Sequence, residues 1–336
     1  MDPASLPMAS NTTTTWGAQT LLAIADSIDH RGKPAIHQTY LPIGPLALLH
    51  AIRVSHATRQ VQGGRASQVG VFQSFLLNQI LMFGGVVLSG FLLGIPSPLL
   101  LAPDVILLYG GTHVLLTVSG LGMKLLAVSE EFSVGLTMDL AFSILDGIMR
   151  SEGILDLGVG EVVRHSSVSI SRSLFAALVN AAIIGGVVPL LIELFRLDSS
   201  VGHWTVAATP PGWFRNPFAG TNDLWSSALV ALVYLGLSQH PLVASSPFNF
   251  FPPSSWSLSS SVPGQKQTDA LDQRVIKTLC ALLLATILTL ERLAKVPAEL
   301  DMQRTKKTVR PAPEMSRLNG NLVVKSSPAK SKKNKA

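Results

Sequence analysis

Long uncharged stretches separated by short charged segments are the main pattern in this sequence. The 38 residues between Arg65 and Asp104 carry no charge. A helix needs only about 20 mostly apolar residues, rising about 1.5 Å each, to cross a membrane. The pattern predicts an all-α membrane protein with seven transmembrane helices, at about residues 34–52, 69–94, 105–120, 132–150, 173–192, 224–243 and 275–294.

Both ends of the chain fall outside the predicted transmembrane domain, which covers residues 34–295. Residues 1–33 are a polar N-terminal segment without the basic start and long apolar run of a secretory signal. Residues 296–336 are rich in Lys, Ser and Pro, so they cannot bury a core and are expected to be a disordered basic tail.

Composition and charge support this division. The chain is 47% hydrophobic and only 14% charged, and its net charge of +6 is uneven. Residues 295–336 hold 11 of the 26 Lys and Arg residues and three acids, so they carry +8 and the remainder −2. Because basic segments stay in the cytosol, we expect a cytosolic C-terminus and, after seven spans, a luminal N-terminus. The tail could bind anionic lipid, and no nucleic-acid partner is expected.

Two predicted spans carry a Gly-Gly pair near their middle. Gly84 and Gly85 lie in the second span, and Gly185 and Gly186 lie in the fifth. Paired glycines let a helix kink or let a neighbouring helix approach closely. The pairs therefore indicate either hinges or close packing.

The placement of the pairs also indicates an internal repeat. Each pair lies in the middle helix of a group of three, in repeats of about residues 34–120 and 132–243, followed by a seventh helix at about 275–294. Because three is odd, the second repeat must be inverted in the membrane. A 3+3 inverted repeat is typical of transporters and channels, whose pathway lies between the halves.

Charged residues within the fourth predicted span are the main candidates for a functional site. Asp139, Asp146 and Arg150 follow one another at spacings of seven and four, so they share one helix face. Charges at this depth cost several kcal/mol unless they pair or line a cavity. Asp146 and Arg150 could simply neutralise each other, or the face could line a pathway or contact a lipid headgroup.

Enzyme motifs are missing from the sequence. There is no H-E-x-x-H, no phosphate-binding loop and no dinucleotide fingerprint, and the eight histidines are scattered. A single cysteine, Cys280, excludes an intramolecular disulfide and a cysteine-based zinc site. We therefore expect no enzymatic activity, no cofactor and no metal site.

Several ordered motifs resemble the trimeric intracellular cation channel family of endoplasmic and sarcoplasmic reticulum membranes. The motifs are a Phe-Gly-Gly with a proline-containing helix exit, a Gly-Gly with an acid, aromatic and arginine exit, and a Gln-His pair: Phe83-Gly84-Gly85 with Pro96-Ser-Pro98, Gly185-Gly186 with Glu193-Leu-Phe-Arg196, and Gln239-His240. The similarity covers roughly residues 35–295.

The resemblance implies a potassium channel that acts as a homotrimer with one pore per subunit. Such a channel supplies counter-ions when calcium leaves the store and needs no cofactor. Gly84, Gly85, Gly185 and Gly186 would let two helices kink around the pore. Asp139, Asp146 and Arg150 would set the local field. A secondary transporter with an inverted repeat is the alternative interpretation.

The family also binds a phosphoinositide headgroup through a lysine and an arginine of its fourth helix. In the best register Arg150 matches that arginine, whereas Asp146 stands in the place of the lysine. A second register, at Gly160–Arg164, also lacks the lysine. The substitution puts phosphoinositide binding in doubt, and an acid at this position should favour cations.

Overall fold

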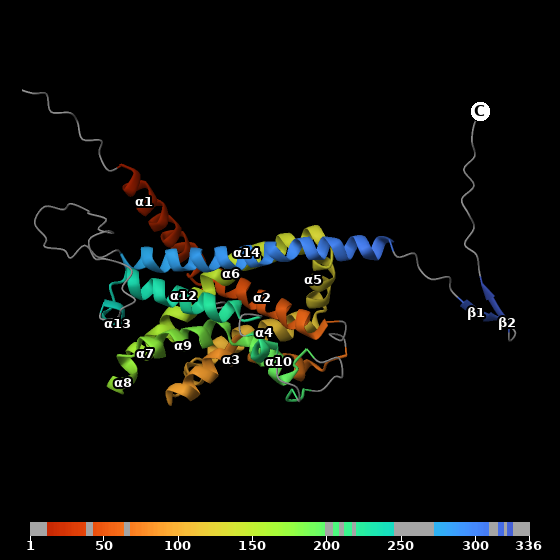
Figure 1. Ribbon diagram of the computed structural model, residues 1–336, viewed down its shortest axis with the longest axis horizontal. Helices are drawn as coiled ribbons and strands as arrows, with labels where there is room; N and C mark the ends of the chain where they lie inside the picture. Colours follow the sequence, from red (N-terminus) through yellow and green to blue (C-terminus); the bar gives the residue numbers. More distant parts are fainter. Residues whose placement is uncertain are drawn as a thin grey trace, which may run out of the picture. The chain divides into compact units, whose positions relative to one another are not determined.

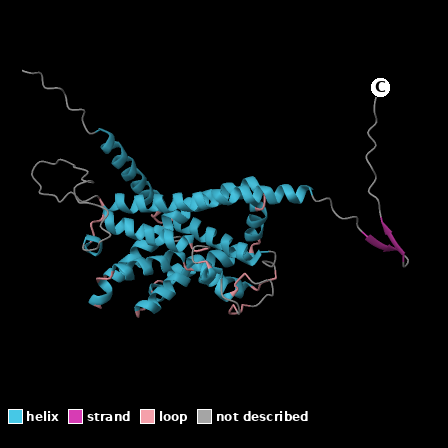
Figure 2. Cartoon of the chain, in the orientation of Figure 1, coloured by secondary structure: helices cyan, strands magenta, loops and turns pink. Residues whose placement is uncertain are grey.

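The computed structural model describes residues 12–37, 43–63, 68–198, 204–207, 212–216, 220–244, 272–308, 315–318 and 321–324. These residues are almost entirely helical (Figures 1 and 2). The predicted helical class is therefore confirmed for them. The chain divides into two compact units, Met1–Thr289 and Leu290–Ala336, and the boundary falls close to the predicted end of the transmembrane domain.

Within the described ranges, two helical stretches are long and apolar enough to cross a membrane on their own. One is α3 (Val71–Leu93), and the other is Phe132–Val163, which joins α6 (Phe132–Gly153), the π-helix η4 (Ile154–Val159) and α7 (Gly160–Val163). They correspond to the second and fourth predicted spans. The fourth span is thus longer than expected, and Arg150 lies within it rather than at its end.

Two bent helix pairs also have the length and apolarity of a span. α4 (Pro103–Val118) meets α5 (Leu121–Ser129) at 85°, and α9 (Leu174–Gly186) meets α10 (Val188–Phe195) at 65°. If each pair is one span, the described residues contain four spans, at the second to fifth predicted positions. The full count of seven stays a prediction.

Large apolar side chains are exposed around these helices. Phe72 and Phe91 of α3, Leu107 and Leu115 of α4, and Phe175 of α9 are each between 68% and 81% exposed. Water would disfavour so much exposed apolar surface, whereas lipid tails would solvate it. These surfaces, together with the long apolar helices, indicate a membrane protein.

The first predicted span is wrong in its position. Residues 34–52 were expected to be helical, but the helix in this region, α2, runs over Pro45–Gln62 and follows α1 (Thr12–Ser27) and η1 (Ile28–Gly32). Proline suits a helix start because its missing N–H would have no partner there. The second half of α2 carries polar side chains that are buried against other parts of the protein. They are Ser55, His56, Thr58, Arg59 and Gln62.

The α2 polar face packs against α3 and α4 through hydrogen bonds. His113 of α4 joins two serines, with its Nδ1 2.8 Å from Ser55 Oγ and its Nε2 2.7 Å from Ser74 Oγ. Arg59 is 2% exposed and donates to Thr117 Oγ1 at 2.6 Å. Most buried polar groups in proteins are paired in this way, so the network helps to fix how the first predicted half is packed.

The last two predicted spans also end differently from expectation. α12 (Asn222–Leu237) stops before a separate short helix, α13 (Pro241–Ala244), which begins at a proline. α14 (Gln273–Thr308) has 36 residues and continues well past the predicted end at residue 294. Residues 296–308, expected to be disordered, are therefore helical. The Arg292 and Glu299 side chains form an ion pair at 2.9 Å that stabilises this extension.

The expected disordered tail also contains two short strands. β1 (Met315–Leu318) and β2 (Asn321–Val324) pair antiparallel, with Ser316 opposite Val323. They are the two strands in the part of the chain that the structure describes. The tail is therefore not disordered throughout.

An apolar core joins the helices of the second predicted half to the start of α14. It contains Ile154, Val159, Val162, Ala177, Ala181, Val230, Leu235, Ile276, Cys280 and Leu284, all nearly or fully buried. Up to Thr289, α14 lies beside α6 and α12 (Figure 1). Gly147 of α6 lies directly against the backbone of Ala285. These helices therefore form one tightly packed group.

Candidate functional site

A cavity of about 370 Å³ lies between the two predicted halves of the first unit. Its walls come from α2 and α3 on one side and from α6, α9, α10 and the start of α12 on the other. Most of the lining is apolar, but five polar side chains face the cavity: His50, Arg53, Asp146, Arg150 and Asp223. It is the kind of site that the inverted-repeat prediction places between the halves.

The Asp146 carboxylate lies beside two residues of α2 and forms an ion pair with one of them, Arg53. Arg53 Nη2 lies 3.4 Å from Asp146 Oδ2, and His50 Nε2 lies 3.7 Å from Asp146 Oδ1. The other ring nitrogen of His50 shares a hydrogen bond with the Tyr109 hydroxyl at 2.7 Å. The Arg53 guanidinium also lies 5.2 Å from the ring centroid of Phe142, a cation–π distance. These contacts tie α2 to α6.

Arg150 makes the second charged contact, on the opposite wall. Its Nη2 donates to Asp223 Oδ2 at 3.0 Å and to the Gly185 carbonyl at 2.6 Å. Arg150 thus joins α6 to the end of α9 and the start of α12. The sequence raised a same-helix pair between Asp146 and Arg150. The structure instead gives each of them an ion-pair partner on another helix.

Pro189 explains why the Gly185 carbonyl can accept this bond. In a continuous helix the carbonyl of residue 185 would accept from the N–H of residue 189. Proline has no N–H, and its ring clashes with the carbonyl four residues earlier. α9 therefore ends at Gly186, α10 begins at Val188 after a bend of 65°, and the freed carbonyl of Gly185 lies at the cavity.

The two Gly-Gly pairs occupy different local structures. α3 continues through Gly84 and Gly85 as one helix without a break. The second pair, Gly185 and Gly186, ends α9 at the bend. Gly186 also lies against the backbone of Asp223, where a side chain would not fit. Gly85 of the first pair is packed closely against α9, and the second pair combines close packing with a bend. The hinge role of both pairs stays a prediction.

The two glycines of α3 should differ in their tolerance to alanine. A Cβ on Gly85 would lie 2.6 Å from the Ile183 carbonyl oxygen of α9, whereas a Cβ on Gly84 would meet only the flexible end of Leu191, at 2.7 Å. We expect Gly85→Ala to lower the free energy of unfolding by about 1–3 kcal/mol, and Gly84→Ala to lower it less. Thermal unfolding in detergent measures both, and equal melting temperatures would contradict the packing described.

Asp139 lies apart from the other candidates. It is on α6, two turns before Asp146, and is not among the residues that line the cavity. It acts electrostatically on His56, whose Nε2 is 3.0 Å from Ser129 Oγ. The structure therefore brings Asp146 and Arg150 to one cavity and leaves Asp139 outside it.

Three of the polar residues that line the cavity were not predicted from the sequence: His50, Arg53 and Asp223. The arginines at positions 53, 59 and 65 favour a loop between the first two predicted spans. However, no glycine or proline interrupts residues 46–62, and their absence was a usable sign that the helix continues. Asp223 had a weaker signal, since it is one acid just before the sixth predicted span.

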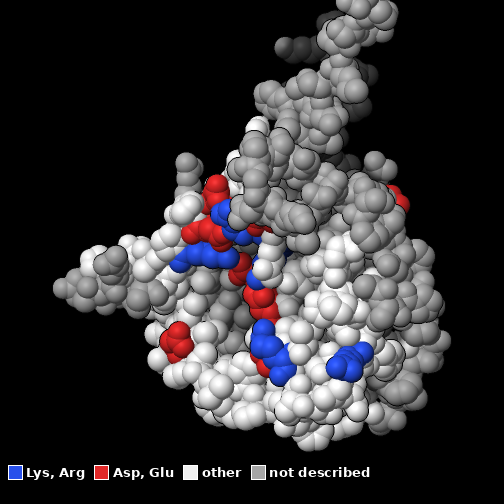
Figure 3. Space-filling view, turned by 90° about the vertical axis from the view of Figure 1, so that its left-hand side faces the viewer, with Lys and Arg blue, Asp and Glu red and all other residues white. Residues whose placement is uncertain are grey.

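Charged side chains also gather at one end of the first unit. Figure 3 shows acidic and basic groups in a band across a face that has few other charges. Their ion pairs link residues before α2, the α6–α7 stretch and the start of α14: Lys33 to Asp29 and Glu152, Arg274 to Asp26, and Lys277 to Asp156. Seven alternating spans would put these three regions on the same side of the membrane.

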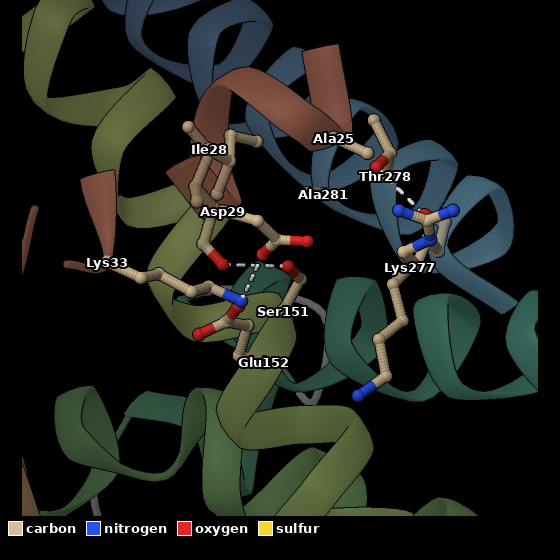
Figure 4. Close-up of a pocket in the computed structure, with 11 residues that line it drawn as sticks. Ala25, Ile28, Asp29, Lys33, Ser151, Glu152, Lys277, Thr278 and Ala281 are labelled. Carbon is tan, nitrogen blue, oxygen red and sulfur yellow. Dashed lines mark hydrogen bonds and ion pairs between the residues drawn. The ribbon is translucent and has the colours of Figure 1, made fainter. Parts of the chain in front are cut away.

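Lys33 is the centre of this charged end, beside a small pocket of about 70 Å³. Its ammonium group lies between the carboxylates of Asp29, at 2.9 Å, and Glu152, at 2.6 Å (Figure 4). The hydrogen bond from Lys33 lowers the pKa of Asp29 despite partial burial. Burial opposes the charge on Lys33, but its bonds to Glu152 and Asp29 outweigh burial and raise the pKa of Lys33.

These shifts predict how the cluster responds to pH. Asp29 stabilises the fold above its ordinary pKa of 3.8 and stops doing so as the pH falls through its lowered pKa. Lys33 stabilises it below 10.5 and stops as the pH rises through its raised pKa. The melting-temperature difference between wild type and Lys33→Met should thus be constant between pH 3.8 and pH 10.5 and become smaller beyond these values. A difference that already changes at about pH 7 would contradict this assignment.

Among the residues that the structure describes, no group of three or more His, Cys, Asp or Glu could hold a metal ion. Comparisons of the chain with protein-family models, with curated proteins and with solved structures gave no match.

Proposed function

We propose that this protein is a channel for monovalent cations, chiefly potassium, in an intracellular membrane. The observation that carries the proposal is the cavity between the predicted halves. There, a helix break in an apolar candidate span exposes the Gly185 carbonyl near the Asp223 carboxylate, and the Asp146 carboxylate lines the same cavity. Carbonyl and carboxylate oxygens are the groups that replace the water around a cation in channels.

The arrangement of the helices supports the proposal. Broken helices at membrane depth are tolerated where they line a cavity, and transport pathways commonly use them. The bend between α9 and α10 is such a break, and it faces the cavity. The proposed architecture is two inverted three-helix repeats with α14 as a seventh helix.

The biological setting in the proposal rests on the resemblance to the trimeric intracellular cation channels. It comprises a homotrimer in the endoplasmic reticulum or another endomembrane, with a luminal N-terminus and a cytosolic C-terminus. Its role would be counter-ion flow during calcium release. A phosphoinositide is not part of the proposal, because Asp146, in the place of the family's lysine, would repel a phosphate group.

Ion flux into vesicles tests the proposal. The purified protein is reconstituted into vesicles with a thallium-sensitive dye inside, and Tl⁺ serves as a potassium substitute. We expect uptake down the Tl⁺ gradient with no other ion gradient or substrate. Uptake that needs a second gradient would favour a secondary transporter, and no uptake by folded protein would contradict both readings.

A matched pair of variants links that flux to the cavity. Asp146→Asn removes an acid that lines the cavity, and Asp139→Asn removes one from the same helix outside it. We expect slower Tl⁺ uptake for Asp146→Asn than for Asp139→Asn, because a negative charge beside the pathway attracts cations. Equal uptake by the two variants would show that the pathway lies elsewhere.

A further inference from the structure

Two different parts of the chain present oxygen atoms to the Arg150 guanidinium. The Gly185 carbonyl oxygen is 2.6 Å from Nη2, Asp223 Oδ2 is 3.0 Å from the same nitrogen, and Asp223 Oδ1 is 3.5 Å from Nη1. All three residues line the cavity of about 370 Å³. The positive charge of a side chain thus occupies a small group of oxygens within the proposed pathway.

The oxygens are brought together by features that do not depend on Arg150. Pro189 frees the Gly185 carbonyl, which lies at the C-terminal, negative end of the α9 dipole. Gly186 has no side chain, so the backbone of α12 around Asp223 can lie directly against the end of α9. The chain would therefore hold a carbonyl and a carboxylate together here even if Arg150 moved away.

We propose that the Gly185 carbonyl and the Asp223 carboxylate form a binding position for a monovalent cation, which Arg150 fills in this structure as a tethered competitor. A permeating ion occupies the position only after the guanidinium leaves it. This inference rests on the proposed channel function and adds to it a particular ion position and the residue that blocks it.

The charge at this position favours a monovalent ion. One carboxylate and one neutral carbonyl balance a single positive charge, whether it belongs to Arg150 or to a potassium ion. A divalent ion would leave one charge uncompensated in a mostly apolar cavity, which is costly. Arginine stays protonated in proteins, so Arg150 must unblock the position by moving and not by losing its proton.

Asp146 is a second carboxylate with which the Arg150 side chain can pair in the same cavity. It lies one turn earlier on α6, at the i,i+4 spacing at which opposite charges on a helix can meet, and it lines the same cavity. A change of side-chain rotamer would carry the guanidinium from Asp223 towards Asp146 without moving a helix. The blocked and unblocked arrangements would then both keep the arginine near a carboxylate.

Neutralising Arg150 tests the inference by Tl⁺ uptake into vesicles. We expect Arg150→Gln to raise uptake by about tenfold over wild type, because the loss of a charge-assisted hydrogen bond shifts an equilibrium by about that factor or more. The matched control is Arg164→Gln, which removes an arginine that does not line the cavity and pairs with Glu161 instead. It should not raise uptake.

Cation binding gives a readout that does not require conduction. In detergent, Tl⁺ should raise the melting temperature of Arg150→Gln in a concentration-dependent way, since a ligand that binds only the folded state stabilises it. Wild type should show little of this effect, because its arginine already fills the position. The double variant Arg150→Gln with Asp223→Asn should lose both the stabilisation and the raised uptake.

The outcomes separate this inference from the proposed function. One outcome is that wild type takes up Tl⁺ while Arg150→Gln shows neither faster uptake nor Tl⁺ stabilisation. That result would support the proposed channel function and overturn the inference that Arg150 blocks a cation position. If Tl⁺ stabilises Arg150→Gln but no variant conducts, the ion position is supported and the channel fails. Should Arg150→Gln not fold, Arg150→Met replaces it. Methionine carries no charge and no N–H donor, so unchanged uptake by folded Arg150→Met would overturn the inference.

Discussion

Replacing Gly147 with valine is expected to separate α6 from α14. A Cβ at this position would lie 2.5 Å from both Cα and Cβ of Ala285 and 2.6 Å from its backbone nitrogen. Backbone atoms cannot rotate away, so the two helices must move apart. We expect a loss of about 3 kcal/mol or more in the free energy of unfolding, the upper range for overpacking. Thermal unfolding in detergent should show a drop of at least about 6 °C.

Gly111→Val is the matched control for this substitution. Gly111 is also a helical glycine, in α4, but a Cβ there would meet no atom within 4 Å. The control should fold and melt close to wild type. A melting temperature as high for Gly147→Val as for Gly111→Val would show that α6 and α14 do not cross as described.

The second large effect is expected from breaking the pair between Arg53 and Asp146. Their side chains are only 23% and 15% exposed, and Asp146→Asn leaves the arginine charge without its carboxylate. Losing one partner of a buried pair lowers the free energy of unfolding by about 3–5 kcal/mol. Because this pair opens onto the cavity and is not fully buried, we expect a loss at the lower end of that range. Asp139→Asn, outside the cavity, should cost much less.

A double-mutant cycle separates this pair from general damage to the helix. If the two side chains interact, Arg53→Gln combined with Asp146→Asn should be less destabilised than the sum of the single variants. The Arg53 contact with the Phe142 ring is lost in both the single Arg53 variant and the double variant. It therefore cancels from the coupling energy. Fully additive losses of stability would contradict the ion pair.

The sequence predicted the helices where hydrophobicity alone decides the structure. α3 and the α6–α7 stretch are apolar over a full span length, and both occur near their predicted positions. The prediction was wrong for α2, where polar residues are buried by protein. A hydropathy pattern reports the solvent preference of each residue, but it does not show that Arg59 or His113 will find hydrogen-bond partners on another helix.

The site could be predicted only in part for a similar reason. The spacing of Asp146 and Arg150 correctly put them on one helix face, but spacing cannot show which residues from other helices meet that face. Asp223 is 73 residues from Arg150 in the chain. The bend at Pro189 was a local signal that could have been read, since a proline four residues after a glycine leaves that carbonyl free.

The most direct test of the central proposal is single-channel recording of the purified protein in a planar bilayer, with different potassium chloride concentrations on the two sides. We expect discrete openings whose current reverses near the equilibrium potential of potassium. Currents that reverse near the chloride potential, or a silent bilayer from protein shown to be folded, would contradict a cation channel.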